Sequence, residues 1–174
     1  MKLIRVLMLT ASMVTLPLVA QQGTGKLKVH ATPGRAGVFI DGKYVGPAAN
    51  FRVARTYQVA AGEHEIKLVD PRYEEFTTKV TIEQGKTAKV RETLKPVAAA
   101  KPPFGRLRVI HADKFAAVYI NGKYYGHVDE FSNFAQGVLV KPGEYEVKVE
   151  PVSGQGFVKK ISVQENQIAV VKAD

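Results

Sequence analysis

A nine-residue segment occurs twice in this chain, and its two copies begin 80 residues apart, at residues 38 and 118. The first copy reads VFIDGKYVG and the second reads VYINGKYYG. Self-similarity at a fixed distance indicates a chain built from two copies of one module. A turn and a hydrophobic pattern recur, whereas no set of chemically reactive side chains recurs with them. The repeat therefore constrains the architecture more tightly than the chemistry.

The similarity extends well beyond this segment. Residues 25–29 match residues 105–109 at the same distance, and residues 62–68 match residues 143–149 one position further along. The second copy has therefore gained one residue in an intervening loop. Both copies keep the spacing of their apolar positions on either side of it, so the repeat covers a whole module.

We predict one module at residues 25–94 and a second at residues 105–172. Residues 95–104 lie between them and contain three prolines among small residues. This composition is typical of an extended, semi-rigid linker. The linker permits two separate modules, although two cores of about 70 residues without disulfides would each gain from docking on the other.

Apolar and polar residues alternate within each predicted module. Leu27 and Val29, for example, alternate with Lys26 and Lys28. A period of two is typical of a strand that buries one face and exposes the other. The sequence therefore predicts an all-β fold of two tandem modules, each a small antiparallel β-sandwich or a partly open barrel.

Turn residues separate the apolar runs. Asp41-Gly42 and Asn121-Gly122 are dipeptides of the kind that most strongly indicates a two-residue β-hairpin. Asp and Asn exchange at this position because both tolerate the backbone of a tight turn. A glycine also opens the longest predicted strand of each module. Structural turn roles are therefore expected at Asp41, Gly42, Asn121, Gly122, Gly62 and Gly143.

The first twenty residues have the features of a signal peptide. Lys2 and Arg5 precede an apolar stretch of about 15 residues, shorter than the roughly 20 that a membrane-spanning helix needs. We predict that residues 1–20 are removed after Ala20 and that the protein is secreted or periplasmic. Retention of the segment as a membrane anchor is the alternative interpretation.

The composition narrows the possible partners and cofactors. The chain contains no cysteine, which excludes disulfides, zinc–thiolate sites and cysteine nucleophiles. Its formal net charge of +9 favours anionic partners through long-range electrostatics. For an exported protein these are an envelope polymer or an envelope protein rather than nucleic acid. We expect no cofactor.

The first copy contains the motifs Gly25-x-Leu27-x-Val29, Thr32-Pro33, Val38-x-Ile40-Asp41-Gly42-x-x-x-Gly46-Pro47 and Ala61-Gly62-Glu63-His64-x-Ile66. Together these motifs resemble the PEGA domain, a short β-rich module of prokaryotic surface and envelope proteins. The second copy has Asp113 where the first has Pro33, and His127 where the first has Pro47. The resemblance implies display, spacing or binding outside the cytoplasm and supplies no catalytic residue.

No constellation of residues predicts catalysis or metal binding. The four histidines do not match between the copies, and none stands at the short spacing that metal ligands require. His64 lies at an inward-facing position of its predicted strand, and Tyr145 occupies the matching position in the second copy. An exchange of His and Tyr is typical of a ring at the rim of a hydrophobic core. Asp41 becomes Asn121, so a catalytic carboxylate would be lost there. We therefore predict neither an enzyme nor a metal site.

Two groups of residues are candidates for binding. The basic set offers one anion-binding strip per module, or alternatively protects edge strands against aggregation. The aromatic set offers exposed rings for stacking on sugars, or alternatively caps a small core. The basic set is Lys26, Lys28, Arg106 and Arg108, with Lys43 and Lys123 on the hairpins, and the aromatic set is Tyr44, Tyr124 and Tyr125.

These features predict an exported, non-enzymatic β-module protein. Its expected role is structural, adhesive or partner-binding at the cell envelope. The alternative is a module that recognises a carbohydrate or an anionic polymer.

Overall fold

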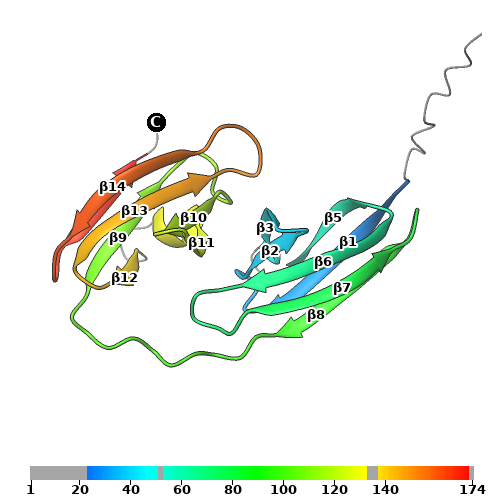
Figure 1. The fold of residues 1–174 in the computed structure, drawn as a ribbon, viewed down its shortest axis with the longest axis horizontal. Coiled ribbons are helices and arrows are strands. Elements are labelled where there is room, and N and C mark those ends of the chain that lie inside the picture. Colours follow the sequence, from blue (N-terminus) through cyan, green and yellow to red (C-terminus); the bar gives the residue numbers. More distant parts are fainter. Residues whose placement is uncertain (1–22, 51–52, 133–136, 173–174) are drawn as a thin grey trace, which may run out of the picture.

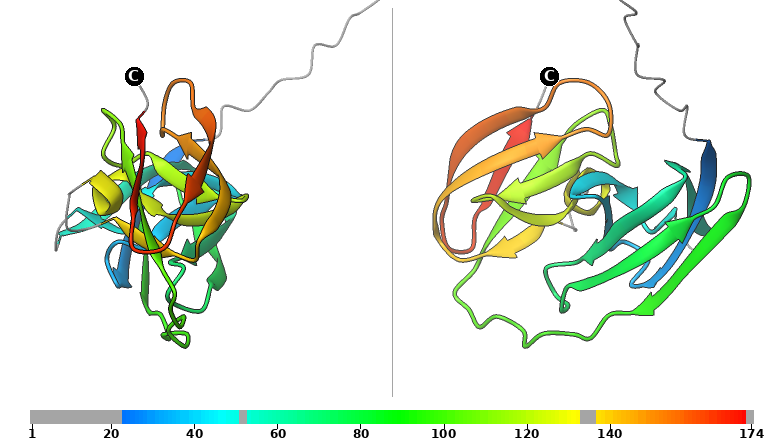
Figure 2. Two further views of the ribbon diagram at one scale, coloured as in Figure 1. Left: turned by 90° about the vertical axis from the view of Figure 1, so that its left-hand side faces the viewer. Right: turned by 45° about the vertical axis from the view of Figure 1, so that its right-hand side comes forward.

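The computed structural model describes residues 23–50, 53–132 and 137–172, which form two β modules side by side (Figure 1). An extended segment connects them along one side of the molecule (Figure 2). The predicted signal peptide lies outside the described residues. Among the described residues, no helix has the length and apolarity needed to cross a membrane.

The first module contains two four-stranded sheets. One sheet has the strand order β4-β5-β1-β8 and the other has the order β3-β2-β6-β7. The strands are β1 (Thr24–Thr32), β2 (Gly37–Ile40), β3 (Lys43–Pro47), β4 (Ala49–Asn50), β5 (Val53–Ala60), β6 (Gly62–Val69), β7 (Phe76–Ile82) and β8 (Thr87–Thr93).

The second module repeats this arrangement with one change. Its sheets have the orders β12-β9-β15 and β11-β10-β13-β14, and a short helix follows the hairpin where the first module has β4. The elements are β9 (Gly105–Ile110), β10 (Ala117–Ile120), β11 (Lys123–His127), α1 (Val128–Ser132), β12 (Val138–Val140), β13 (Gly143–Glu150), β14 (Phe157–Val163) and β15 (Ile168–Lys172).

Each module encloses one hydrophobic core between its two sheets. Leu27 and Val29 of β1 are fully buried against Ile66 and Leu68 of β6, while the residues between them on β1 are exposed. Among the described residues, the two sheets of a module share no ladder. The all-β prediction is therefore confirmed, and of the two expected forms the sandwich is correct. The period-two pattern marks which face of each strand is buried.

One pair of strands in each module differs from the antiparallel expectation. β1 pairs with β8 in parallel, and β9 pairs with β15 in parallel, whereas the other ladders are antiparallel. Parallel neighbours need a long crossover connection. The entire second sheet of each module supplies that connection, since β1 and β8 are the first and last strands of their module.

The two hairpin turns have the backbone that their residues favour. Asp41 and Gly42 have φ values of 51° and 79°, and Asn121 and Gly122 have φ values of 49° and 76°. Positive φ at both central residues is the type I′ geometry that matches the twist of a hairpin.

The turn side chain also anchors a neighbouring strand in both modules. Oδ1 of Asp41 accepts a hydrogen bond from the Glu65 amide at 2.9 Å, and Oδ1 of Asn121 accepts the equivalent bond from Glu146 at 2.9 Å. This shared contact explains why Asp and Asn exchange here.

His64 is held at both of its ring nitrogens. Nδ1 lies 2.6 Å from Oδ2 of Asp41, and Nε2 lies 3.0 Å from the carbonyl oxygen of Ala60. Tyr145 replaces this histidine in the second module and donates its hydroxyl to the Lys141 carbonyl at 2.7 Å. Hydrogen bonds with the His64 ring and the Glu65 amide hold the pKa of Asp41 below its usual value.

The first residues of the predicted linker are attached to the first module. The Glu74 amide donates to the carbonyl of Lys95 at 2.8 Å, and the Val97 amide donates to the carbonyl of Arg72 at 2.9 Å. Tyr73 also forms an isolated bridge with Pro96. The segment that leaves β8 is therefore positioned by the loop between β6 and β7.

The turn geometry predicts the effect of replacing either turn glycine. Gly42→Val and Gly122→Val should each lower the free energy of unfolding of their module by about 1–3 kcal/mol, because a β-branched residue resists positive φ. A Cβ would meet no atom within 4 Å at either site, so steric clash does not contribute. Chemical denaturation measures the change.

Gly42→Asn is the matched control, since Asn tolerates this backbone. Equal stability of the Val and Asn variants would contradict the assigned turn.

Candidate functional site

The two modules contact each other through their short hairpins. The β2–β3 hairpin faces the β10–β11 hairpin at the centre of the molecule (Figure 1). Residues from both hairpins form a third hydrophobic cluster, separate from the two module cores. It contains Phe39, Tyr44, Val69, Ala117 and Tyr124, with Tyr119 packed against it. The repeated segment is therefore also the surface through which the copies dock.

The aromatic rings of this cluster pack mainly edge to face. The Phe39 ring lies 5.4 Å from the Tyr44 ring and 5.4 Å from the Tyr124 ring. The rings of Tyr44 and Tyr124, which occupy matching positions in the two copies, are 5.5 Å apart. Pairs at such distances each contribute about 0.5–1.5 kcal/mol beyond the area that they bury. The cluster thus stabilises a single arrangement of the modules.

A glycine makes room for one of these rings. A Cβ atom on Gly37 would lie 2.5 Å from Cζ of Tyr124, closer than real atoms pack. The second module has Ala117 at the matching position, so the hairpins are not equivalent in this contact. The Tyr44 hydroxyl donates to the carbonyl of Phe115 at 3.0 Å, which adds a polar contact across the interface. Burial raises the pKa of both tyrosines.

An ion-pair cluster lies beside the aromatic rings. Asp70 is only 2% exposed and accepts hydrogen bonds from Nε and Nη2 of Arg72, each at 2.9 Å. The same Arg72 donates through Nη2 to Glu130 of α1 at 2.9 Å. Arg35 lies 3.2 Å from Asp70 and 3.5 Å from Glu130. Two arginines of the first module therefore share a carboxylate from each module.

The cluster changes the ionisation of its buried member. Burial of the Asp70 carboxyl opposes ionisation, but the hydrogen bonds from Arg72 and the charges of Arg72 and Arg35 outweigh it. The pKa of Asp70 consequently lies below its usual value. A buried carboxylate with this many donors is stabilised as an anion.

A cation–π contact adds to the interface. The guanidinium of Arg55 on β5 lies 4.7 Å from the ring centroid of Phe115, in the loop before β10. A cation over an aromatic face at this distance is attracted by the ring. The docked arrangement thus combines apolar, aromatic and charged contacts.

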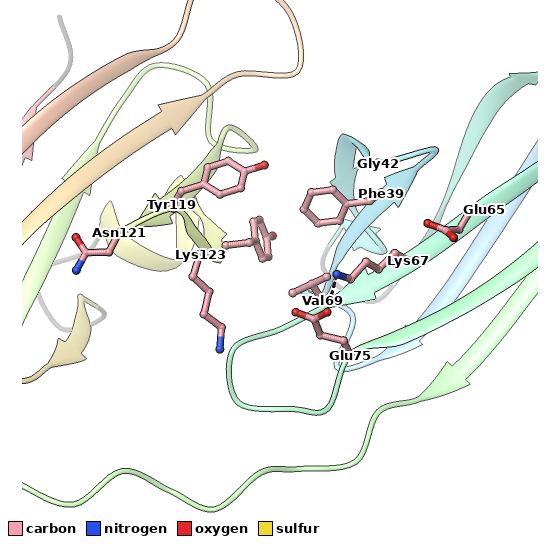
Figure 3. A pocket seen from close by; sticks show the side chains of 11 residues that line it. Phe39, Gly42, Glu65, Lys67, Val69, Glu75, Tyr119, Asn121 and Lys123 are labelled. Carbon is pink, nitrogen blue, oxygen red and sulfur yellow. Dashed lines mark ion pairs between the residues drawn. The ribbon is translucent and has the colours of Figure 1, made fainter.

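An open groove of about 720 Å³ lies between the modules, beside the hairpins. Phe39 and Tyr119 approach it from opposite modules (Figure 3). Lys67 and Glu75 form an ion pair along its side, with Nζ and Oε2 2.5 Å apart. Lys123 also lines the groove. Its charged side chains therefore include an ion-paired lysine and glutamate as well as Lys123 and Glu65.

The predicted basic residues fall in three separate places. Lys26 and Lys28 are exposed on β1, which lies between β5 and β8. The edge-strand interpretation of these lysines is therefore wrong, because β1 has a hydrogen-bonded neighbour on each side. Lys43 and Lys123 belong instead to the hairpin strands β3 and β11.

The second module does not reproduce the basic strip of the first. Arg106 and Arg108 lie on β9, which is also a central strand, and both are only half-exposed. Nη2 of Arg108 donates to the carbonyl of Ser132 at 2.6 Å. The two strips of the anion-binding alternative therefore differ in exposure, since Lys26 and Lys28 are exposed while Arg106 and Arg108 are half-exposed.

Two of the three predicted sugar-stacking tyrosines are buried. Tyr44 and Tyr124 are 6% and 5% exposed, because each packs in the interface between the modules. The alternative in which these two rings are exposed for stacking on sugars therefore does not hold. Tyr125 is half-buried and packs against the core of the second module. The core-capping interpretation describes these rings better than the binding interpretation.

Several residues of the interface carry no signal in the sequence. Asp70 and Glu130 are matched by Pro151 and Asn50 in the other copy, so the repeat gives no indication of their pairing. Gly37 is one glycine among 15. Within the described part of the chain, no three His, Asp or Glu side chains gather in a way that could hold a metal ion.

Comparisons with known proteins give one family match. Residues 24–98 match the model of the PEGA domain. No curated protein matches the chain. Three chains of solved structures match, one of them the Bacillus anthracis TIE protein, with 18% identity and a TM-score of 0.35. That match covers 87% of this chain and 34% of the other, so the chain spans about a third of its length.

The contact between Gly37 and Tyr124 predicts a specific loss of docking. Gly37→Val should separate the modules, because its side chain would occupy the position of the Tyr124 ring. Small-angle scattering should show a larger radius of gyration for the variant.

Adding Tyr124→Ala to Gly37→Val tests the mechanism, because removing the ring relieves the clash. The double variant should be less destabilised than the two single changes predict together. Additive free energies of unfolding would contradict the proposed contact.

The lowered pKa of Asp70 predicts a pH-dependent stability. A carboxyl with a depressed pKa in the folded state stabilises the fold above about pH 4, its ordinary unfolded pKa. This contribution is lost as the pH falls through the folded-state pKa. Asp70→Asn should therefore lower the free energy of unfolding by about 1–3 kcal/mol at neutral pH. Its difference from wild type should shrink below about pH 4.

Denaturation curves across this pH range measure the effect. Asp129→Asn, which alters an exposed carboxylate of α1, is the control and should change stability little. If the difference in free energy of unfolding between wild type and Asp70→Asn stays constant down to about pH 2, the lowered pKa of Asp70 is refuted.

Proposed function

Residues 24–98 are a PEGA domain, and on this premise we propose that the protein is an exported, non-enzymatic component of the cell envelope. PEGA domains are typically extracellular or periplasmic. The predicted signal peptide supports the same location. The proposed role is structural or adhesive: the protein positions a binding surface outside the cytoplasm.

The docked hairpins are the observation that carries this proposal. Two modules with small cores are held together by the aromatic cluster and by the arginines that connect Asp70 to Glu130. A flexible pair of modules would lose conformational freedom on binding, whereas a docked pair is already ordered. The arrangement suits a protein that holds two surfaces at a fixed distance.

The interface argues against sugar stacking as the main activity. Tyr44 and Tyr124 would have to leave the cluster to reach a sugar ring, and they would give up the aromatic contacts that join the modules. Recognition of an anionic polymer does not require such a rearrangement.

Cell fractionation and intact-mass measurement test the proposed export. The protein should be recovered from the envelope or the medium, with residues 1–20 removed. Lys2→Glu/Arg5→Glu, which removes the positive charges before the apolar stretch, should leave the chain uncleaved inside the cell. An envelope species that still begins at Met1 would identify the segment as an anchor, and a wild-type chain confined to the cytoplasm would refute export.

The adhesive role has its own test. Washed envelopes should retain wild-type protein more strongly than Gly37→Val, because undocked modules lose their fixed arrangement. The double variant Gly37→Val/Tyr124→Ala keeps the valine but removes the ring with which it clashes. It therefore distinguishes a loss of docking from a loss of stability within the first module. Equal retention of all three forms would show that docking plays no part in envelope binding.

A further inference from the structure

One face of the first module is strongly cationic. The outward-facing side chains of β1 include Lys26, Lys28 and His30, and all three are exposed. The parallel neighbour β8 adds Lys89 and Arg91 to the same face. The remaining residues of this face on β1, β5 and β8 are neutral, and the set contains no carboxylate: Thr24, Thr32, Ala54, Thr56, Gln58, Ala60, Thr87 and Thr93.

The register of β1 and β8 places like charges side by side. Lys28 is the direct partner of Lys89, and Arg91 follows two residues further along β8. Like charges at directly opposed positions destabilise a sheet. Among the described residues, none of Lys26, Lys28, Lys89 and Arg91 forms an ion pair. The fold therefore maintains a repulsive arrangement without an internal counter-charge.

Protection of a sheet edge does not explain this arrangement. Lys89 and Arg91 could guard the free edge of β8, since β8 is the last strand of its sheet. Lys26 and Lys28 lie on β1, whose two edges are already paired. Charges on a central strand do not block edge pairing, so they need another explanation.

We propose that this face, which we call the β1–β8 face, binds a linear polymer that carries repeated phosphate or carboxylate groups. A shallow depression of about 300 Å³ marks its centre. Lys28, Lys89 and Arg91 line the depression together with Ala54. Successive outward positions on one strand are about 6.6 Å apart and adjacent strands about 4.8 Å apart, so the cations can contact several anionic groups at once.

The composition of the face favours a polymer over a membrane surface. Proteins that rest on a bilayer add apolar or aromatic side chains to their basic residues. The β1–β8 face has alanine, threonine and glutamine beside its cations and no large apolar residue. Its attraction is therefore electrostatic, without a component that would enter a lipid layer.

The binding face belongs to the first module alone. The second module has Ile168 and Val170 in place of Thr87 and Lys89. Val170 is the direct partner of Arg108, in the position where Lys89 is the partner of Lys28. The second module keeps Lys172 where the first has Arg91, but Val170 leaves Arg108 without the cationic partner that Lys28 has in Lys89. This inference depends on the proposed function only for the location of the polymer outside the cytoplasm.

Polyphosphate and poly-L-glutamate are suitable probes, because they separate phosphate from carboxylate recognition. The purified protein should bind at least one of them at about 50 mM salt, and binding should weaken steeply towards about 300 mM salt. Lys28→Gln/Lys89→Gln should weaken this binding about tenfold. It should not lower the unfolding temperature, because it removes a repulsive pair.

Lys159→Gln/Lys160→Gln is the matched control, since it removes two exposed lysines from β14 of the second module. Its affinity should stay within about twofold of wild type. Binding to poly-L-glutamate but not to polyphosphate would support the β1–β8 face as the binding site and show that it recognises carboxylates. Equal losses of affinity in the two variants would mean that binding depends only on net charge, which would overturn the proposed site. Failure of the wild-type protein to bind either polymer would also overturn it. Neither negative result would affect the tests of export and of module docking.

Discussion

The contact between the two short hairpins is the constraint on which the rest of the structure depends. Each module has a core made mainly of Val, Leu and Ile, and there is no disulfide to support it. Docking buries Phe39, Tyr44 and Tyr124 together, and it places Arg72 between a carboxylate of each module. Because Glu130 belongs to the second module, its ion pairs with Arg35 and Arg72 form only in the docked arrangement. The linker therefore does not set the relative position of the modules by itself.

Docking also decides which surfaces remain available to partners. It removes the most conspicuous aromatic residues from the surface, so that the broad sheet faces become the accessible parts of the molecule. These faces differ between the modules even though the strands that form them correspond. In the first module the face is cationic, and in the second Arg106 and Arg108 lie beside Ile168 and Val170. A duplicated module has thus kept its core and turns while its exposed positions have changed.

The sequence allowed much of each module to be predicted, because the relevant signals are local. Alternation along β1 identifies Leu27 and Val29 as buried, and the Asp41-Gly42 dipeptide indicates a tight hairpin within four residues. The candidate site was predicted only in part. Lys26 and Lys28 were identified, but Lys89 and Arg91 were missed, because no local pattern shows that β8 returns to lie parallel to β1 about 60 residues later. The sequence left open whether the tyrosines are buried or exposed, and only the fold places Tyr44 and Tyr124 in the contact between the modules.

By itself, the sequence determined the two-module repeat, the all-β class, the buried face of each strand and the chemistry of the turns. These depend on side-chain alternation and backbone preference over a few residues. Only the tertiary structure decided that β1 is a central strand, that Tyr44 and Tyr124 face each other, and that Asp70 and Glu130 share Arg72. Each of these is a contact between segments far apart in the chain. The physical reason is that register and docking depend on which surfaces bury the most apolar area and pair the most charge, a comparison among whole surfaces that no short stretch of sequence contains.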